Sequence, residues 1–287
     1  MTGRAGIVLF AGLTAIVASS FAACPSDEQV DVYLQDFAQA RLSKGLGNDL
    51  TREEAECAQA KLIKKLPNVL GRVVGYKAAF TNPAVQQRFG ISSPAWGVMF
   101  EKMLVQSGAK LPMNFAARPI FEADLIAVVK DPALAEARTP LEALRCIEAI
   151  GAFLELPDLM LEGEGLPSGT AHIATNVGFR SGVLGPRVKA EATQEFLDKL
   201  ANMTVVLTEG RSSKELGRAP GKAILDNPVN SAMWLAQALK KAGIDLKPGD
   251  LLSLGGFIPP SPVQSYTIIT VKYVGLPGDP AVTVRFD

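Results

Sequence analysis

The 287-residue chain has little histidine, little cysteine and no excess of charge, and each shortage argues against a class of function. His172, the single histidine, is the only base available to a Ser–His or Cys–His mechanism, and no Gly-x-Ser-x-Gly elbow accompanies it. The three cysteines contain no Cys-x-x-Cys spacing, which argues against a zinc or thioredoxin-type site. Basic and acidic residues number 29 each, so no basic surface for nucleic acid is indicated. A small-molecule substrate or a protein partner remains.

The first residues are typical of a secretory signal. Arg4 precedes an apolar run over 7–17, and small residues follow it up to Cys24. We therefore predict a signal peptide over 1–23 and a periplasmic or secreted mature protein. An uncleaved N-terminal anchor is the alternative, although the apolar run hardly approaches the ~20 residues that span a bilayer. The segment ending at Cys24 also resembles a bacterial lipoprotein cleavage box, and a lipid on Cys24 would be the only attachment to a membrane that we expect.

The cysteines suggest one cross-link. In an oxidising compartment one pair of the three could form a disulfide. A Cys24–Cys57 bond would tie the N-terminus to the second predicted helix, provided that Cys24 carries no lipid. Cys146 is expected to be either a partner in such a bond or a buried, inert thiol.

Residues 24–70 are predicted to form a helical N-terminal segment. The spacing of apolar residues predicts a helix over 27–45. Thr51 and Glu54 form a capping box, in which each side chain satisfies a free backbone N–H, and the helix that they open should end near Pro67.

Residues 71–287 are predicted to form one domain in which strands predominate in the second half. Strands are expected over 71–80, 118–129, 152–156, 250–254, 266–274 and 281–286, with a hairpin that starts at 203 and turns around Glu209-Gly210. Helices should begin at Asn82-Pro83, at Thr139-Pro140 (continuing through Ile147) and at Asn227-Pro228 (ending at Gly243). Because strands and helices do not alternate regularly, the fold class is predicted to be α+β rather than doubly wound α/β.

The most informative feature is a pair of acids, Glu122 and Asp124, inside an apolar stretch rich in β-branched residues. Residues two apart on a strand point to the same face, so both carboxylates would face one place. Two buried like charges are costly unless a positive group lies between them. A divalent, oxygen-preferring cation such as Mg²⁺ or Mn²⁺ is the natural candidate. The alternative is an edge strand with one solvated face.

Other isolated polar residues follow the same logic. Glu155 is an acid inside the apolar run Ala-Phe-Leu-Glu-Leu-Pro, and with the first two acids it would form a facial set of oxygen ligands. Lys77 is the lone charge in 73–80, where it could be a desolvated acid or base, an anion clamp, or a lysine that snorkels at a strand edge. Asp158 is expected to be a solvated turn residue, and His172 a surface or hydrogen-bonded residue.

Seven segments occur together in an order shared with a known family: 74–86, 89–100, 118–125, 153–156, 174–176, 221–243 and 248–255, followed by a closing strand that ends in Val-Arg-Phe. By these segments the chain resembles the 2-keto-4-pentenoate hydratase group within the fumarylacetoacetate hydrolase superfamily. The resemblance covers roughly residues 27 to 287. It implies a mixed β-roll with an α-helical N-terminal part, and we expect a homo-oligomer.

The resemblance also implies a chemistry. A Mg²⁺ or Mn²⁺ ion would be held by Glu122, Asp124 and Glu155, and the substrate would be a small 2-keto or 2-hydroxydienoic acid that chelates the metal. The metal would then polarise the carbonyl and stabilise enolate charge. Lys77 would pair with the substrate carboxylate or move protons, and Asn176 would be a second substrate-binding residue.

The chain departs from the family pattern at several places. Asp124 stands where Glu is commoner, Ala95 replaces a candidate acid–base carboxylate, and Thr175-Asn176 replaces an Asp-Asn pair. These departures leave three hypotheses: an exported metal-dependent hydratase, a non-catalytic metal and keto-acid binder on the same scaffold, and a related decarboxylase or C–C bond hydrolase. The hydrolase branch uses a histidine upstream of the metal strand, whereas the only histidine here lies downstream.

Overall fold

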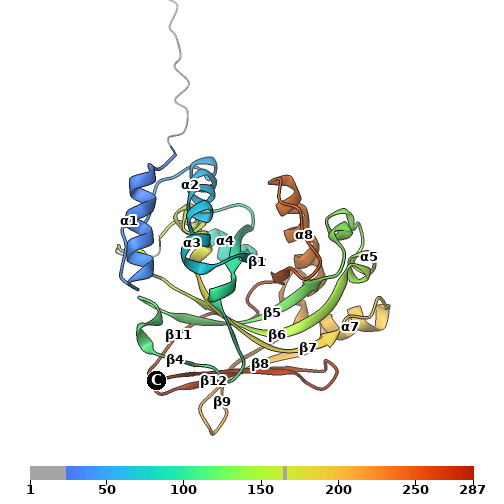
Figure 1. Ribbon diagram of the computed structural model, residues 1–287. Coiled ribbons are helices and arrows are strands. Elements are labelled where there is room, and N and C mark those ends of the chain that lie inside the picture. Colours follow the sequence, from blue (N-terminus) through green and yellow to red (C-terminus); the bar gives the residue numbers. More distant parts are fainter. Residues whose placement is uncertain (1–23, 164–166) are drawn as a thin grey trace, which may run out of the picture.

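Two β-sheets and a group of helices make up the structure, which is a computed structural model that describes residues 24–163 and 167–287. Most helices lie on one side of the larger sheet, and the smaller sheet packs on its other side (Figure 1). The α+β class predicted from the sequence is therefore confirmed. The predicted signal peptide, 1–23, lies outside the described residues and stays a prediction.

The larger sheet contains eight strands and carries the candidate site. Its order is β2-β1-β10-β5-β6-β7-β3, with β11 paired to β5. The parallel pairs are β1 with β10 and β3 with β7, and the other pairs are antiparallel. The strands are β1 (Val73–Ala79), β2 (Ala95–Phe100), β3 (Leu104–Gln106), β5 (Ile120–Val129), β6 (Ile147–Pro157), β7 (Phe179–Lys189), β10 (Leu251–Ser253) and β11 (Ser261–Pro262).

The smaller sheet has the order β4-β13-β12-β8-β9 and closes the core from below in Figure 1. Its strands are β4 (Lys110–Leu111), β8 (Thr204–Glu209), β9 (Lys214–Pro220), β12 (Ile268–Val274) and β13 (Ala281–Phe286). Along β12, alternate residues Ile269, Val271 and Tyr273 are fully buried, as the two-residue period of a half-buried strand requires. The Tyr273 hydroxyl donates to the backbone carbonyls of Asp124 and Phe153. These hydrogen bonds connect β12 of the smaller sheet to β5 and β6 of the larger one.

The helices are α1 (Asp27–Ala38), α2 (Arg52–Lys65), α3 (Pro67–Leu70), α4 (Pro83–Phe89), α5 (Pro140–Arg145), α6 (Gly169–Ala174), α7 (Gln194–Asn202) and α8 (Pro228–Lys241). Short 3-10 turns are η1 (Glu101–Met103), η2 (Met113–Phe115), η3 (Pro132–Glu136), η4 (Asn176–Gly178) and η5 (Gly221–Ala223). Within the described ranges, no helix combines the length and the apolar character that a membrane crossing needs.

The N-terminal part is helical as predicted, and the capping box at Thr51 is confirmed. The first helix is shorter than the predicted 27–45, because Ala40 has a left-handed backbone (φ 49°) and the chain turns back after α1. A disulfide joins Cys24 to Cys57 and so fixes the N-terminus to α2. This bond uses the thiol that lipidation of Cys24 would require. No finding tests the proposed division into domains at residue 70.

Most other elements lie where the sequence predicts them, including the Asn227 cap of α8 and the hairpin of β8 and β9. The helix opened by Thr139-Pro140 was predicted too long: α5 ends at Arg145, since Ile147 already begins β6. Eight elements were not predicted: β2, β3, β4, β7, β11, α3, α6 and α7. The sequence of β7 contains Gly185-Pro186, a pair more typical of turns, which hides its strand pattern.

Candidate active site

The candidate site lies at the end of β10, in the middle of the larger sheet. β10 pairs with β1 on one side and with β5 on the other, and its last residue, Ser253, lies level with Lys77 and Ile126. Both neighbouring strands continue beyond this point, whereas the chain leaves β10 as Leu254 and a glycine pair. The loop that follows still runs along β5, where Phe257 N–H donates to Ala123 O at 2.9 Å.

The three predicted acids come together at this place. Glu122 on β5 lies directly opposite Glu155 on β6, and Asp124 follows on the same side of β5. Asp124 is fully buried, Glu155 is 1% exposed and Glu122 is partly buried. β5 is bordered by β10 and β6, so the alternative of an edge strand with a solvated face is wrong.

Lys77 reaches across from β1 to the same acids. Its ammonium lies 2.5 Å from Glu155 Oε1, and the two side chains are 6% and 1% exposed. Burial alone would lower the pKa of Lys77, but the charges of Glu155 and Glu122 and the hydrogen bond outweigh it and raise the pKa above its ordinary value. Lys77 is therefore a buried, charged hydrogen-bond donor and not a snorkelling surface lysine.

Asp124 accepts four hydrogen bonds, three of them from residues at the end of β10. Its Oδ1 accepts from the backbone N–H groups of Leu125 (2.5 Å), Leu254 (3.1 Å) and Gly255 (3.0 Å). Its Oδ2 accepts from the hydroxyl of Ser253 at 2.6 Å. Ser253 is fully buried and was not singled out in the sequence, because a serine between leucines gives no signal of its partner.

The acids repel one another strongly. Burial, together with the charge of Glu155, raises the pKa of Glu122 to about 8. The same causes raise the pKa of Asp124 to about 7, against the hydrogen bonds from Ser253 and Leu125 that favour its ionised form. Three carboxylates against one ammonium leave two negative charges uncompensated when all are ionised, and this excess is what a divalent cation would balance.

The side chains as they lie do not yet form a metal cage. Among residues 24–163 and 167–287, no three His, Cys, Asp or Glu side chains are grouped closely enough to hold a metal ion. The physical reason is that Lys77 draws Glu155 toward β1 while the end of β10 holds Asp124. In charge and in oxygen donors the set nevertheless fits Mg²⁺ or Mn²⁺. Its role as a metal site stays a prediction.

The two glycines that follow β10, Gly255 and Gly256, lie close to Thr81 and Glu122, respectively. A Cβ atom added at Gly256 would lie 2.7 Å from Glu122 Oε2, so a side chain at this position would require that carboxylate to shift. Thr81, which the sequence reasoning missed, is 8% exposed, and a Cβ atom at Gly255 would lie 2.8 Å from its hydroxyl. The glycine pair thus allows the loop to approach Glu122 and Thr81 closely.

Asn176, the second predicted substrate-binding residue, is buried beside β2. Its amide oxygen accepts from Val98 N–H at 2.7 Å, and its amide nitrogen donates to Val98 O at 2.9 Å. These bonds anchor η4 to the edge strand, which is a positioning role. Contact of Asn176 with a substrate stays a prediction.

Ala95, His172 and Asp158 complete the comparison with the sequence. Ala95 is buried opposite Ala79 at the start of β2, on the face of the sheet that carries Lys77. His172 is 6% exposed rather than on the surface. Asp158 is not a solvated turn residue: it is 3% exposed and accepts the backbone N–H groups of Ala117 and Arg118 at 2.9 and 2.8 Å.

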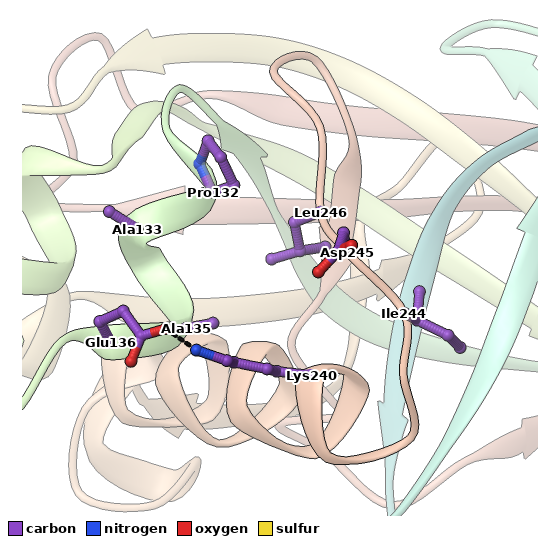
Figure 2. A pocket seen from close by; sticks show the side chains of 8 residues that line it. All are labelled: Pro132, Ala133, Ala135, Glu136, Lys240, Ile244, Asp245 and Leu246. Carbon is purple, nitrogen blue, oxygen red and sulfur yellow. Dashed lines mark hydrogen bonds and ion pairs between the residues drawn. The ribbon is translucent and has the colours of Figure 1, made fainter.

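A surface pocket lies elsewhere, between η3 and the end of α8 (Figure 2). Lys240 and Glu136 form an ion pair at its rim, and none of the predicted site residues lines it. A second pocket is lined by Arg52, Thr170 and residues 90–93, again without the acids. Neither pocket is lined by the three acids or by Lys77, which the sequence predicts for the site.

Comparison with known proteins agrees with the predicted resemblance, although no protein-family model matches the chain. A 2-keto-4-pentenoate hydratase from Burkholderia vietnamiensis is 28% identical over 188 residues, covering 66% of this chain and 69% of the hydratase. The structure of a 4-oxalocrotonate decarboxylase from Pseudomonas putida G7, complexed with magnesium and adipate, superposes with a TM-score of 0.78. It is 21% identical and covers 91% of this chain and 97% of the decarboxylase.

A fumarylpyruvate hydrolase from Pseudomonas aeruginosa, in complex with Mn²⁺ and pyruvate, matches more loosely, with a TM-score of 0.54 and 15% identity over 75% of this chain and 89% of the hydrolase. At these identities the structural likenesses show the fold alone. The resemblance predicted from the ordered segments is confirmed: the chain is similar in sequence to the 2-keto-4-pentenoate hydratases and has the fold of the fumarylacetoacetate hydrolase superfamily.

Proposed function

We propose that the chain is a divalent-metal-dependent lyase of the hydratase type that acts on a small 2-keto or 2-hydroxydienoic acid. The single observation that carries the proposal is the buried cluster of Glu122, Asp124 and Glu155 facing the ammonium of Lys77. Such a cluster is expensive to bury, and structural need alone does not explain it. The similarity to hydratases supports the choice of reaction.

The three acids would hold Mg²⁺ or Mn²⁺, because a hard divalent cation prefers carboxylate oxygens and balances their excess charge. When bound, such a cation would act as a Lewis acid toward the carbonyl and carboxylate oxygens of a keto acid. Without metal, Glu155 is paired with Lys77, and Asp124 keeps one oxygen, Oδ2, that accepts a single hydrogen bond.

The residues of the chain supply the remaining requirements. Lys77 keeps a proton at Nζ and, once Glu155 is shared with a cation, can direct an N–H toward the carboxylate of a bound acid. Gly255 and Gly256 bring backbone close to the acids and keep side chains out of the space beside Glu122. The Tyr273 hydroxyl holds the backbone of β5 and β6, so Glu122 and Glu155 stay opposite each other.

A non-catalytic keto-acid binder is the second candidate, and Ala95 favours it. Ala95 is 1% exposed and carries no group that can transfer a proton, at a position where the resemblance implies a carboxylate. In that case oxalate or pyruvate would raise the melting temperature in the presence of metal, without turnover. A decarboxylase or C–C hydrolase differs in its products, since hydration adds a water and breaks no carbon–carbon bond.

Export and oligomerisation are part of the proposal. The Cys24–Cys57 disulfide supports a periplasmic or secreted protein, because such bonds persist in oxidising compartments. A homo-oligomer is proposed from the resemblance alone. Protease accessibility in intact cells and light scattering of the mature protein would test these two points.

The decisive experiment joins metal analysis to turnover. Wild type and Glu122→Ala are compared for Mg²⁺ and Mn²⁺ content, and metal-loaded wild type is then given a short 2-hydroxydienoate. We expect bound metal in wild type, its loss in the variant, and a fall of the dienoate's ultraviolet absorbance with a hydrated product. Bound metal without turnover of any short dienoate would refute the hydratase reaction, and equal metal in both proteins would refute the site.

A further inference from the structure

His172 is buried in a way that its protein neighbours do not explain. It lies on α6, is 6% exposed, and within the described ranges its Nε2 is the one fully buried side-chain nitrogen or oxygen without a hydrogen-bond partner. Leaving a buried polar atom unpaired is unfavourable, and such an atom in a native structure needs a specific reason. A leucine or phenylalanine would fill the same space without this cost.

The surroundings of the imidazole are aromatic. Its ring lies 5.2 Å from the ring of Phe89, edge to face, and 6.4 Å from that of Phe80. Phe89 is the last residue of α4, and Phe80 directly follows the end of β1. Burial and the nearby charge of Lys77 lower the pKa of His172 to about 4. The imidazole is therefore neutral near pH 7 and has one N–H to donate and one lone pair.

The position of α6 connects His172 to the candidate site. α6 runs into η4, and η4 packs on Gly97, where an added Cβ atom would lie only 2.5 Å from Val177. Gly97 pairs with Lys77 across β1 and β2, so α6 and η4 cover the sheet face from which Lys77 projects. Ala95 lies on that face too and presents only a methyl group.

We infer that His172 Nε2 forms a hydrogen bond with an oxygen of the keto acid bound beside Lys77, on the side of the site where Ala95 offers no polar group. This inference rests on the proposed function, because it takes the ligand to be a keto acid. It makes His172 a substrate-binding residue. The ligand would supply the partner that Nε2 lacks, and the neutral imidazole would add no second cation next to Lys77.

Because His172 is the only histidine in the chain, its imidazole can be observed alone. Protein labelled with ¹⁵N-histidine and carrying no histidine tag is titrated with oxalate or pyruvate in the presence of Mg²⁺, while calorimetry measures binding. We expect the ring nitrogen signals to shift and to saturate with the dissociation constant that calorimetry gives. Binding by calorimetry with unmoved ring signals would overturn the inference.

Two substitutions separate substrate binding from packing. His172→Leu should fold at least as stably as wild type, because it removes the unpaired nitrogen, and it should weaken oxalate binding by about tenfold or more. His172→Gln, which keeps a donor and an acceptor, should retain more of the affinity. Phe89→Leu, a control that changes the aromatic contact only, should leave affinity within about twofold. A destabilised His172→Leu protein with wild-type affinity would assign His172 to packing and refute the inference.

Failure of the inference is distinct from failure of the hydratase proposal. If oxalate moves the imidazole signals but no dienoate is turned over, the role of His172 stands and only the hydratase reaction is refuted. If neither oxalate nor pyruvate binds metal-loaded wild type, His172 has no keto acid to contact and the inference is refuted as well.

Discussion

Replacing Lys77 with methionine tests whether the buried ion pair holds the acid cluster together. Methionine keeps an unbranched side chain of similar length and removes the charge and the hydrogen bond to Glu155. Lys77 Nζ and Glu155 Oε1 lie 2.5 Å apart, and the two side chains are 6% and 1% exposed. Water can therefore hardly replace the ammonium as a partner of the Glu155 carboxylate. Removing one partner of such a pair leaves an uncompensated buried charge and costs about 3–5 kcal/mol.

The measurement is urea unfolding of metal-free wild type and Lys77→Met. For a protein of this size a loss of 1 kcal/mol lowers the melting temperature by about 2–4 °C. The expected loss of unfolding free energy then corresponds to a melting temperature that is lower by roughly 6–20 °C. The loss should be larger near pH 8 than near pH 5, because at low pH an unpaired buried carboxyl can take up a proton instead of remaining charged.

Matched variants show what would refute this reasoning. Lys240→Met removes the cation of the Lys240–Glu136 pair, which is 53% and 63% exposed, and it should cost at most about 1 kcal/mol. The double variant Lys77→Met/Glu155→Leu should recover much of the stability, since the carboxylate that Lys77 contacts is removed together with the lysine. A Lys77→Met protein within about 1 kcal/mol of wild type, or one with equal losses at both pH values, would contradict the assigned role of Lys77.

Three further predictions concern the pH dependence of stability, the substitution of Gly256 and the Cys24–Cys57 disulfide. Because the folded-state pKa values of Glu122 and Asp124 are raised to about 8 and about 7, the folded metal-free protein binds protons that the unfolded chain has lost. Its unfolding free energy should therefore fall as pH rises from about 5 to 8, and Mg²⁺ should stabilise it more at the upper end, as urea titrations with chelator or with metal would show; a flat profile contradicts this. Gly256→Ala, whose Cβ would lie 2.7 Å from Glu122 Oε2, should weaken Mg²⁺ binding in calorimetry more than it lowers stability. Cys57→Ser opens a disulfide between residues 33 positions apart and should cost about 4 kcal/mol in urea unfolding, whereas Cys146→Ser should cost far less; a disulfide variant as stable as wild type contradicts the bond.

The sequence could predict which acids share one place, because that depends on local periodicity. Glu122 and Asp124 point the same way simply because strand residues alternate, and Glu155 stands out as an acid in an apolar run. The pairing of Lys77 with Glu155 could not be predicted in this way. It joins residues 78 positions apart and depends on the strand order β1-β10-β5-β6, which no local pattern contains.

The errors have physical causes of the same kind. The first helix was predicted too long because the apolar spacing continues past Ala38. The left-handed backbone at Ala40 ends the helix. Asp158 was expected in a solvated turn, whereas its buried carboxylate accepts from two backbone N–H groups about forty residues away in the chain. His172 was expected to be a surface or hydrogen-bonded residue, whereas its buried ring packs against phenylalanines from another segment.

The fold shows what an aspartate does at position 124, where the family more commonly has glutamate. A shorter side chain than the commoner glutamate lets Oδ1 accept the N–H groups of Leu254 and Gly255, the two residues that directly follow β10. The same carboxylate thus terminates β10 and faces the other two acids, and its Oδ1 is already committed to the backbone. Glu122, for which no such bonds are found among the described residues, is the acid free to adjust to a cation. Metal binding here should therefore depend on the mobility of Glu122 and on the rigidity of Asp124, a division of roles that three equal glutamates would not impose.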